Sequence, residues 1–265
     1  MTTPARHRFR QLHESGTFVL PNPWDVGSAR LLQHLGFAAL ATTSSGFAAS
    51  LGRLDQHVSL DELVSHVASL TAAVEVPVNV DAERGYGDDP AGVATTAELL
   101  AAAGASGMSL EDYDPTADRL DTVDVAAERV AAAAEVCRRH GVVLTGRAEN
   151  HLHGVTDLDD TIARLRAYRD AGAEALYAPG LVDIDQIARV VRAVGAPLNV
   201  LALRRGPSVP ELAAVGVRRV STGGSLAWSG YGGLVAAASE LQEHGTSTYL
   251  DAALPWAVRT AAFLD

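Results

Sequence analysis

Residues 170–176 read DAGAEAL, and this short segment contains a pattern that recurs along the chain. The same order of features appears in HLGFAAL (34–40), AAGASGM (102–108) and AVGVRRV (214–220). In each, an amphipathic segment ends, a glycine follows, and an apolar run begins. Because glycine takes the left-handed conformation after a helix without a steric penalty, the pattern is typical of a helix, its stop and the next strand.

Outward from these segments, the chain alternates apolar runs with segments of helical spacing. The apolar runs are nearly continuous, as in strands of a parallel sheet that are buried on both faces. Eight such units favour a closed barrel over an open doubly wound sheet, and no break in composition marks a second domain. We therefore predict one (β/α)8 (TIM) barrel domain over residues 1–265. The expected strands are 18–21, 38–43, 76–82, 107–111, 142–148, 175–179, 197–202 and 219–222, and the expected helices are 24–35, 59–74, 90–103, 123–140, 157–171, 183–194, 209–215 and 226–244.

The segment after Gly245 predicts one more helix, within about 246–265. It contains the apolar residues Leu250, Leu254, Trp256 and Phe263. An exposed apolar helix is not stable alone, so the segment packs either on its own barrel or on a neighbouring subunit. The sequence leaves both arrangements open.

Charge and composition narrow the classes of function. The formal net charge is -11 and the sequence pI is about 5.2, which argues against nucleic-acid and anionic-membrane partners. The first 16 residues have no apolar core of a signal peptide, and no window approaches the length of a membrane span. We expect a cytoplasmic enzyme. The one cysteine, Cys137, is interpreted as a packed side chain rather than a catalytic thiol.

Acidic side chains at neighbouring strand ends are the main chemical signal. Asp81 and Glu83 lie two residues apart at the end of one expected strand, and Glu111 ends the next. Neighbouring parallel strands are about 4.8 Å apart, so three carboxylates there repel each other unless a cation relieves them. Oxygen ligands suit Mg²⁺ or Mn²⁺. In the alternative interpretation, these acids cap helices or pair with Arg84 and Arg147.

Two further features near the carboxyl ends of the expected strands indicate anion binding. Arg147 is the basic residue at the end of an apolar strand, where a guanidinium can grip an anionic substrate or pair with a nearby acid. The turn formed by Thr43, Ser44, Ser45 and Gly46 offers hydroxyl and backbone N–H groups to carboxylate or phosphate oxygens. Such turns are common, so this signal is weak alone, as is the glycine pair at 223–224.

The chain resembles the isocitrate lyase/phosphoenolpyruvate mutase superfamily over nearly its whole length. Four segments show the resemblance: NPWDVGSARLLQHLGFAALATTSSGFAASLGRLD (22–55), VPVNVDAERGYGDDP (76–90), AAAGASGMSLED (101–112) and TGRAEN (145–150). The run VDAERGYG followed by GMSLED is the most specific. The resemblance implies a barrel that binds Mg²⁺ and a small 2-oxo or 2-hydroxy carboxylate, in a dimer or tetramer with an exchanged C-terminal helix.

The resemblance also implies roles for individual residues. Asp81 matches the direct metal ligand, while Glu83 and Glu111 match acids that hold the metal largely through water. Asp55 matches an acid near the metal's water shell or the substrate. The remaining matches concern the substrate. Thr43, Ser44 and Ser45 match the loop that binds its carboxylate. Trp24 matches an aromatic residue of the pocket, and Arg147 matches the arginine that binds the substrate.

Four departures from the superfamily pattern bear on the reaction, and together they weaken the usual lyase chemistry. The lyases carry a Lys-Lys/Arg-Cys-Gly-His loop after strand 4, whereas residues 113–120 here read YDPTADRL. The Lys-x-Asn of the mutases is missing as well. Glu83 replaces an aspartate, and Pro179 stands where the lyases have a glutamate. The proton shuttle must therefore come from elsewhere, with Tyr86, Tyr113, Glu149 and His151 as the residues to consider.

The leading hypothesis is a Mg²⁺-dependent lyase that cleaves a C–C bond in a small 2-hydroxy or 2-oxo carboxylate through a stabilised enolate. Arg147, Glu111, Asp55 and Tyr86 are its expected catalytic residues. The second hypothesis is P–C chemistry, as in a phosphoenolpyruvate mutase or phosphonopyruvate hydrolase. The third is a barrel that binds a small carboxylate without catalysis.

Overall fold

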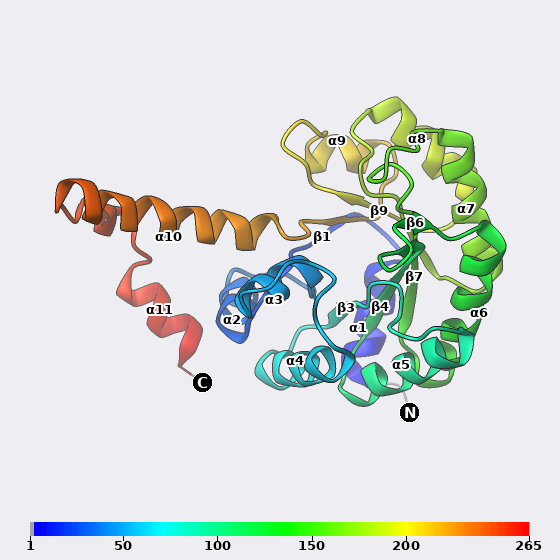
Figure 1. Cartoon of the computed structure of the whole chain (residues 1–265), viewed down its shortest axis with the longest axis horizontal. Coiled ribbons are helices and arrows are strands. Elements are labelled where there is room, and N and C mark those ends of the chain that lie inside the picture. Colours follow the sequence, from blue (N-terminus) through cyan, green and yellow to red (C-terminus); the bar gives the residue numbers. More distant parts are fainter. Residues whose placement is uncertain (1–2, 265) are drawn as a thin grey trace.

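The structure is a computed structural model that describes residues 3–264. Eight parallel strands form one sheet in the order β1-β10-β9-β8-β7-β4-β3-β2. The Ala41 N–H donates to the Pro21 carbonyl at 3.0 Å, and this bond links the two end strands and nearly closes the barrel seen in Figure 1. The barrel strands are β1 (Phe18–Leu20), β2 (Leu40–Ala41), β3 (Val78–Asp81), β4 (Gly107–Glu111), β7 (Val143–Arg147), β8 (Ala175–Tyr177), β9 (Leu198–Leu201) and β10 (Arg219–Ser221).

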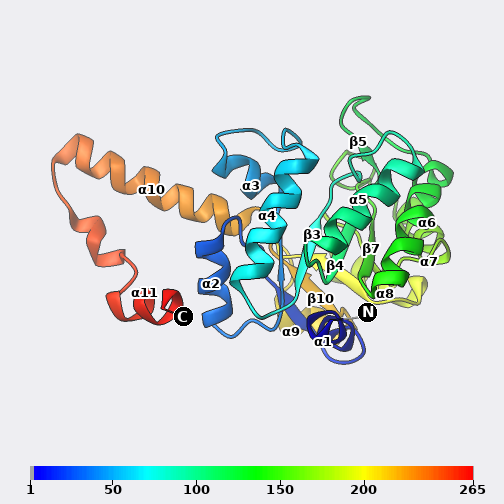
Figure 2. The ribbon, with the colours of Figure 1, turned by 90° about the horizontal axis from the view of Figure 1, so that it is seen from below.

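Helices alternate with the strands and cover the outside of the barrel (Figure 2). The prediction of a (β/α)8 barrel with an additional C-terminal helix is thus confirmed, although each strand except β4 is shorter than the apolar run that predicted it. The helices are α1 (Pro4–Leu12), α2 (Val26–His34), α3 (Ser44–Ser50), α4 (Leu60–Ala73), α5 (Pro90–Ala102), α6 (Val123–His140), α7 (Leu158–Asp170), α8 (Ile184–Val194), α9 (Val209–Ala214), α10 (Ser225–His244), the 3₁₀ helix η1 (Thr248–Ala252) and α11 (Trp256–Phe263).

Helix α1 was not predicted, and it packs against the barrel near the start of the strands. The Thr3 side chain caps it and Pro4 occupies its first turn, which are ordinary start signals. Phe9 is fully buried and packs edge-to-face on His13 and Phe18. The Arg6 guanidinium donates to the backbone carbonyls of Ala101, Ala105 and His140, which fastens the helix to the barrel.

Two connections differ from the sequence prediction. The expected Thr-Ser-Ser-Gly turn is instead the start of α3, because the Thr43 hydroxyl accepts the Gly46 N–H and caps a helix. The segment after β4 folds into a hairpin of β5 (Tyr113–Asp114) and β6 (Arg119–Leu120). Arg84 holds this hairpin with two 2.8 Å bonds to Asp121, which follows β6.

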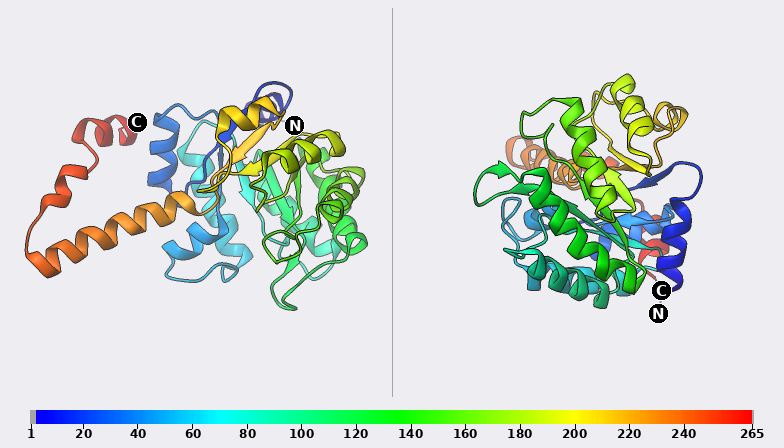
Figure 3. Two further views of the ribbon diagram at one scale, coloured as in Figure 1. Left: turned by 90° about the horizontal axis from the view of Figure 1, so that it is seen from above. Right: turned by 90° about the vertical axis from the view of Figure 1, so that its right-hand side faces the viewer.

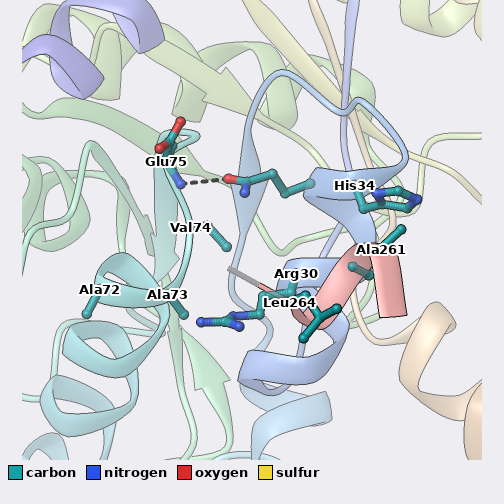
Figure 4. A pocket seen from close by; sticks show the side chains of 10 residues that line it. Arg30, His34, Ala72, Ala73, Val74, Glu75, Ala261 and Leu264 are labelled. Atoms are coloured by element: carbon teal, nitrogen blue, oxygen red, sulfur yellow. Dashed lines mark hydrogen bonds between the residues drawn. The ribbon is translucent and has the colours of Figure 1, made fainter. Parts of the chain in front are cut away.

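The C-terminal part leaves the barrel. Helix α10 projects away from it, and the chain then turns back so that α11 approaches α2 (Figures 1 and 3). The Arg30 guanidinium donates to the Phe263 carbonyl at 3.2 Å. Figure 4 shows the cavity of about 660 Å³ between α2, the end of α4 and α11, well away from the acidic strand ends. Among residues 3–264, no helix has both the length and the apolar character that a membrane crossing requires.

Candidate active site at the rim of the barrel

Asp81, the last residue of β3, is fixed on both sides of its carboxylate. The Ser44 N–H at the start of α3 donates to Oδ2 at 3.1 Å, and Arg147 Nη1 donates to Oδ1 at 3.3 Å. The Asp81 N–H donates to the Thr42 hydroxyl at 2.8 Å. Three separate segments therefore orient this carboxylate towards a small cavity at the centre of the barrel.

Glu111 ends β4 and is also held by two donors. Arg147 Nη1 lies 3.1 Å from Oε2, and Gln56 Nε2 donates to Oε1 at 3.0 Å. The side chain is almost fully buried, and this burial raises the pKa of Glu111 well above its usual range although Arg147 opposes the shift. The Arg147 guanidinium lies between the carboxylates of Asp81 and Glu111 and compensates both.

Glu83 does not share the surroundings of Asp81. The strand ends at Asp81, and Glu83 has a φ of +48°, so the alternation that predicted one common face does not extend to it. Its carboxylate accepts the Tyr86 hydroxyl at 3.1 Å and lines a neighbouring cavity of about 190 Å³ with Gln56. Burial, and then the charge of Asp81, raises the pKa of Glu83 to about 8.

Arg147 forms ion pairs with three acids at this end of the barrel. Besides Asp81 and Glu111, it donates from Nε to Glu149, which is buried behind it. Burial opposes the positive charge, but the three carboxylates raise the pKa of Arg147 well above its usual range. The guanidinium also lies 5.2 Å from the ring centroid of Tyr177. Arg147 is therefore always charged, and it holds the acids of adjacent strands together.

The α3 segment adds polar groups near Asp81. Asp55 forms a hydrogen bond with the Ser44 side chain, and although the residue is exposed, partial desolvation of its carboxyl and then the charge of Asp81 raise its pKa. The Ser45 hydroxyl accepts the indole N–H of Trp228 from α10 at 3.1 Å.

Trp24 packs close to Gly46, where an added Cβ would lie 3.0 Å from the Trp24 Cβ. The structure thus brings the expected carboxylate-binding segment, Asp55 and Trp24 to the same side of the barrel.

Other residues considered as proton shuttles have other partners. His151 Nε2 hydrogen-bonds the Thr161 hydroxyl at 2.9 Å. Tyr113 stacks on His153 at a ring separation of 3.7 Å, and its hydroxyl donates to Asp118 at 2.6 Å. Neither His151 nor Tyr113 lines the cavity at Asp81.

Several polar residues that the sequence reasoning did not assign to the site also line that cavity. It measures about 40 Å³, which is the space of about one water molecule. The available signal was a polar side chain inside or at the end of an apolar run, since such residues need hydrogen-bond partners when they are buried. They include Tyr177, Asn199, Arg219 and Ser221, on β8, β9 and β10.

The donor set is compatible with Mg²⁺. This ion keeps several water ligands and needs only one or two carboxylates, which Asp81 and its neighbours can supply as oxygen ligands. Burial, and then the charge of Asp81, raises the pKa of Glu83, and a nearby cation would stabilise the charged form of both acids. Within residues 3–264, no three His, Cys, Asp or Glu side chains converge on one point. A metal here would therefore be bound largely through water.

A (β/α)8 barrel with acids and an arginine at the carboxyl ends of adjacent strands defines a class of enzyme, and comparison with known proteins identifies the family. The model of the phosphoenolpyruvate phosphomutase family matches residues 9–242, so the chain belongs to that family. It is an enzyme of the carbon–carbon lyase type in the PEP mutase/isocitrate lyase superfamily, as the sequence predicted.

Three similar proteins illustrate the relationship. A structure from Burkholderia cenocepacia, described as that of a lyase or mutase, is 49% identical with a TM-score of 0.94, covering 98% of this chain and 96% of the other. An oxaloacetate decarboxylase of Bradyrhizobium sp. is 31% identical over 73% of this chain and 69% of its own length. Oxaloacetate acetylhydrolase in complex with its product oxalate is 28% identical with a TM-score of 0.88, over 98% and 94% of the chains.

Proposed function

We propose that this protein is a Mg²⁺-dependent lyase that cleaves a C–C bond in a small 2-oxo or 2-hydroxy carboxylate. The observation that carries the proposal is the fixed position of Asp81 between the Ser44 N–H and the Arg147 guanidinium, at the edge of a buried polar cavity. A carboxylate held on both sides is preorganised for binding a cation and an anionic substrate together.

In this proposal, Asp81 would bind the metal directly, and Glu83 and Glu111 would hold it through water. When bound, the metal would supply a Lewis acid for developing negative charge on the substrate. Arg147 and the Thr43–Ser45 segment hold the substrate carboxylate, and Trp24 closes one side of the pocket. Asp55, hydrogen-bonded to Ser44, orients this segment. A location in the cytoplasm remains a prediction.

Oxaloacetate is the first substrate to test, because two of the similar proteins are named for reactions of that compound. The measurement is pyruvate or oxalate formation with Mg²⁺ and after chelation by EDTA. We expect turnover with Mg²⁺ and loss of more than 100-fold with EDTA or in Asp81→Ala. The control Asp61→Ala removes an exposed acid of α4 and should keep full activity. Full metal-dependent turnover by Asp81→Ala would refute the assignment.

P–C chemistry is the second candidate, since the matching family model is that of phosphoenolpyruvate phosphomutase. The composition opposes it: all 21 residues counted as Lys or Arg are arginines, so no lysine can replace the missing Lys-x-Asn. ³¹P NMR with phosphonopyruvate separates the two candidates. Conversion of phosphonopyruvate without any reaction of 2-oxo dicarboxylates would favour the mutase or hydrolase.

We also propose that the protein is a homo-oligomer in which α10 and α11 pack on a second copy. The support is the apolar surface of the projecting helix, where Trp228, Leu234, Val235 and Leu241 are all more than half exposed. Light scattering on the protein as it elutes from a size-exclusion column measures the mass of the particle in solution. A monomer at micromolar concentration would contradict this arrangement.

A further inference from the structure

Tyr177, the last residue of β8, points into the site but was not among the expected catalytic residues. Its side chain is buried and lines the central cavity together with Asp81 and Arg147. The guanidinium of Arg147 lies over its ring. The phenol is therefore positioned beside the groups to which a substrate would bind.

Three buried or half-buried tyrosines differ in what receives the hydroxyl proton. Tyr86 donates to Glu83 at 3.1 Å, and Tyr168 donates to Asp112 at 2.5 Å. Tyr177 instead has the Ser221 hydroxyl beside it in the cavity, and a hydrogen bond with Ser221 lowers the pKa of Tyr177. Among the described residues, no carboxylate accepts the Tyr177 hydroxyl, so its proton is not held by an acid as the protons of Tyr86 and Tyr168 are.

A chain of donors leads to the Tyr177 oxygen from the interior of the barrel. Arg219 Nε donates to Asn199 Oδ1 at 3.0 Å, and Asn199 Nδ2 donates to Ser221 Oγ at 2.9 Å. The Ser221 hydroxyl, which accepts from Asn199, keeps its own proton and can donate it to the neighbouring Tyr177 oxygen. When Ser221 donates to Tyr177, all three bonds run in the same direction, so each polarises the next and favours negative charge on the Tyr177 oxygen.

No acid in the described part of the protein neutralises the positive charge of Arg219, the residue at which this series of hydrogen bonds begins. Arg219 is only 2% exposed, and its remaining partners are the Thr145 hydroxyl and His13 Nε2. No carboxylate of the described chain forms an ion pair with it. A buried cation without a counter-ion is costly, but it also stabilises an anion that forms nearby.

The surroundings of Tyr177 also favour proton transfer in comparison with the other two tyrosines. Burial raises the pKa of Tyr177 to about 12, while Arg147 and Ser221 oppose the rise. The pKa values of Tyr86 and Tyr168 are raised further, since each faces a carboxylate in addition to being buried. The chain has no lysine, and Cys137 is buried outside the site. Neither a lysine nor the cysteine can therefore supply the proton.

We propose that Tyr177 is the catalytic acid that protonates the enolate carbon, and that Ser221, Asn199 and Arg219 are its positioning residues. This inference rests on the proposed lyase function. With oxaloacetate, the C–C bond to the departing carboxylate breaks, CO₂ leaves, and the electron pair forms the enolate. The enolate carbon then takes the proton from Tyr177 Oη, and water reprotonates the tyrosinate, which releases hydroxide. The sum is oxaloacetate dianion plus water to pyruvate, CO₂ and hydroxide.

The test isolates proton transfer from bond cleavage. Pyruvate has no C–C bond to the second carboxylate, so exchange of its methyl protons with D₂O, followed by ¹H NMR with Mg²⁺, reports only the acid–base step. We expect exchange by the natural protein and at least a 100-fold loss in Tyr177→Phe. The affinity for oxalate, measured by calorimetry, should change less than threefold, because the phenol is not needed to hold the anion.

Substitutions at Ser221 separate a positioning role from a packing role. Ser221→Ala should lower the exchange rate about fivefold, which corresponds to one hydrogen bond of about 1 kcal/mol. Ser221→Thr keeps the hydroxyl and should restore the rate. If Tyr177→Phe exchanges within threefold of the natural rate, or if the natural protein shows no exchange, the tyrosine proposal is wrong. If exchange is normal but no 2-oxo acid is cleaved, the proposed lyase function fails instead.

Discussion

The buried His13 should make the stability of the fold depend on pH in a calculable way. Its Nδ1 hydrogen-bonds the Phe9 carbonyl at 2.8 Å, and its Nε2 faces Arg219 Nη1 at 3.3 Å. A neutral ring with the proton on Nδ1 satisfies both contacts. Burial, and then the charge of Arg219, lowers the pKa of His13 from 6.5 to about 3.

The sign follows from proton uptake. Between pH 6.5 and 3 the unfolded chain binds a proton at this position and the folded chain does not, so stability falls as the pH is lowered through that window. From the two pKa values, the contribution of His13 falls by about 2 kcal/mol between pH 7 and pH 5, and by about 5 kcal/mol in the acid limit. His66, whose pKa burial lowers to about 4, changes stability in the same direction.

Urea unfolding of the natural chain and of His13→Gln at both pH values measures the effect. Glutamine offers Arg219 a neutral acceptor that does not titrate. The difference in unfolding free energy between the two proteins should shift by about 2 kcal/mol from pH 7 to pH 5, in favour of the variant at pH 5. Using the difference removes the contribution of His66. An equal difference at both pH values would show that His13 is protonated in the fold or accessible to water.

Three substitutions test other parts of the fold by urea unfolding. Arg84→Met removes the bidentate pair with Asp121 and should cost about 1–3 kcal/mol and open residues 113–120 to proteases; a hairpin that stays resistant would contradict this. Gly146→Ala places a Cβ 2.7 Å from the Tyr168 Cβ and should cost about 1–3 kcal/mol. Gly233→Ala, with no atom within 4 Å, should stabilise α10 by about 0.5–1 kcal/mol; similar effects at both glycines would refute the packing argument.

The barrel could be predicted from the sequence because its signals are local. Gly141 and Gly195 end α6 and α8 with φ values of +71° and +65°, which is the conformation that the repeated pattern indicated. Ser59 and Glu62 form a capping box at the start of α4, which is a local start signal of the same kind. The segment at Thr43 was predicted as an anion-binding turn, but it begins a helix. The same residue types occur in helix caps and in such turns, and only the residues that follow determine which of the two forms.

The site could be predicted in part, because the carboxyl ends of all strands in a parallel barrel lie at the same end of the barrel, whatever the arrangement of the helices. This placed Asp81, Glu111 and Arg147 together. The interior chain from Arg219 to Tyr177 could not be found in this way. It depends on which side chains of β8, β9 and β10 point to the barrel axis, and a continuous apolar run has no alternation that shows the inward face.

The hairpin after β4 limits how this barrel can be redesigned. Arg84 comes from the loop after β3 and also lies 3.4 Å from Asp114, so it joins two successive loops through charged bonds at both ends of the hairpin. A loop taken from a related barrel and inserted over residues 113–120 would lose Asp114 and leave Arg84 with only Asp121. Exchange of the segment as a module therefore requires replacing Arg84 and Asp121 together with it, and we expect transplants that ignore this coupling to fold poorly before their activity can be compared.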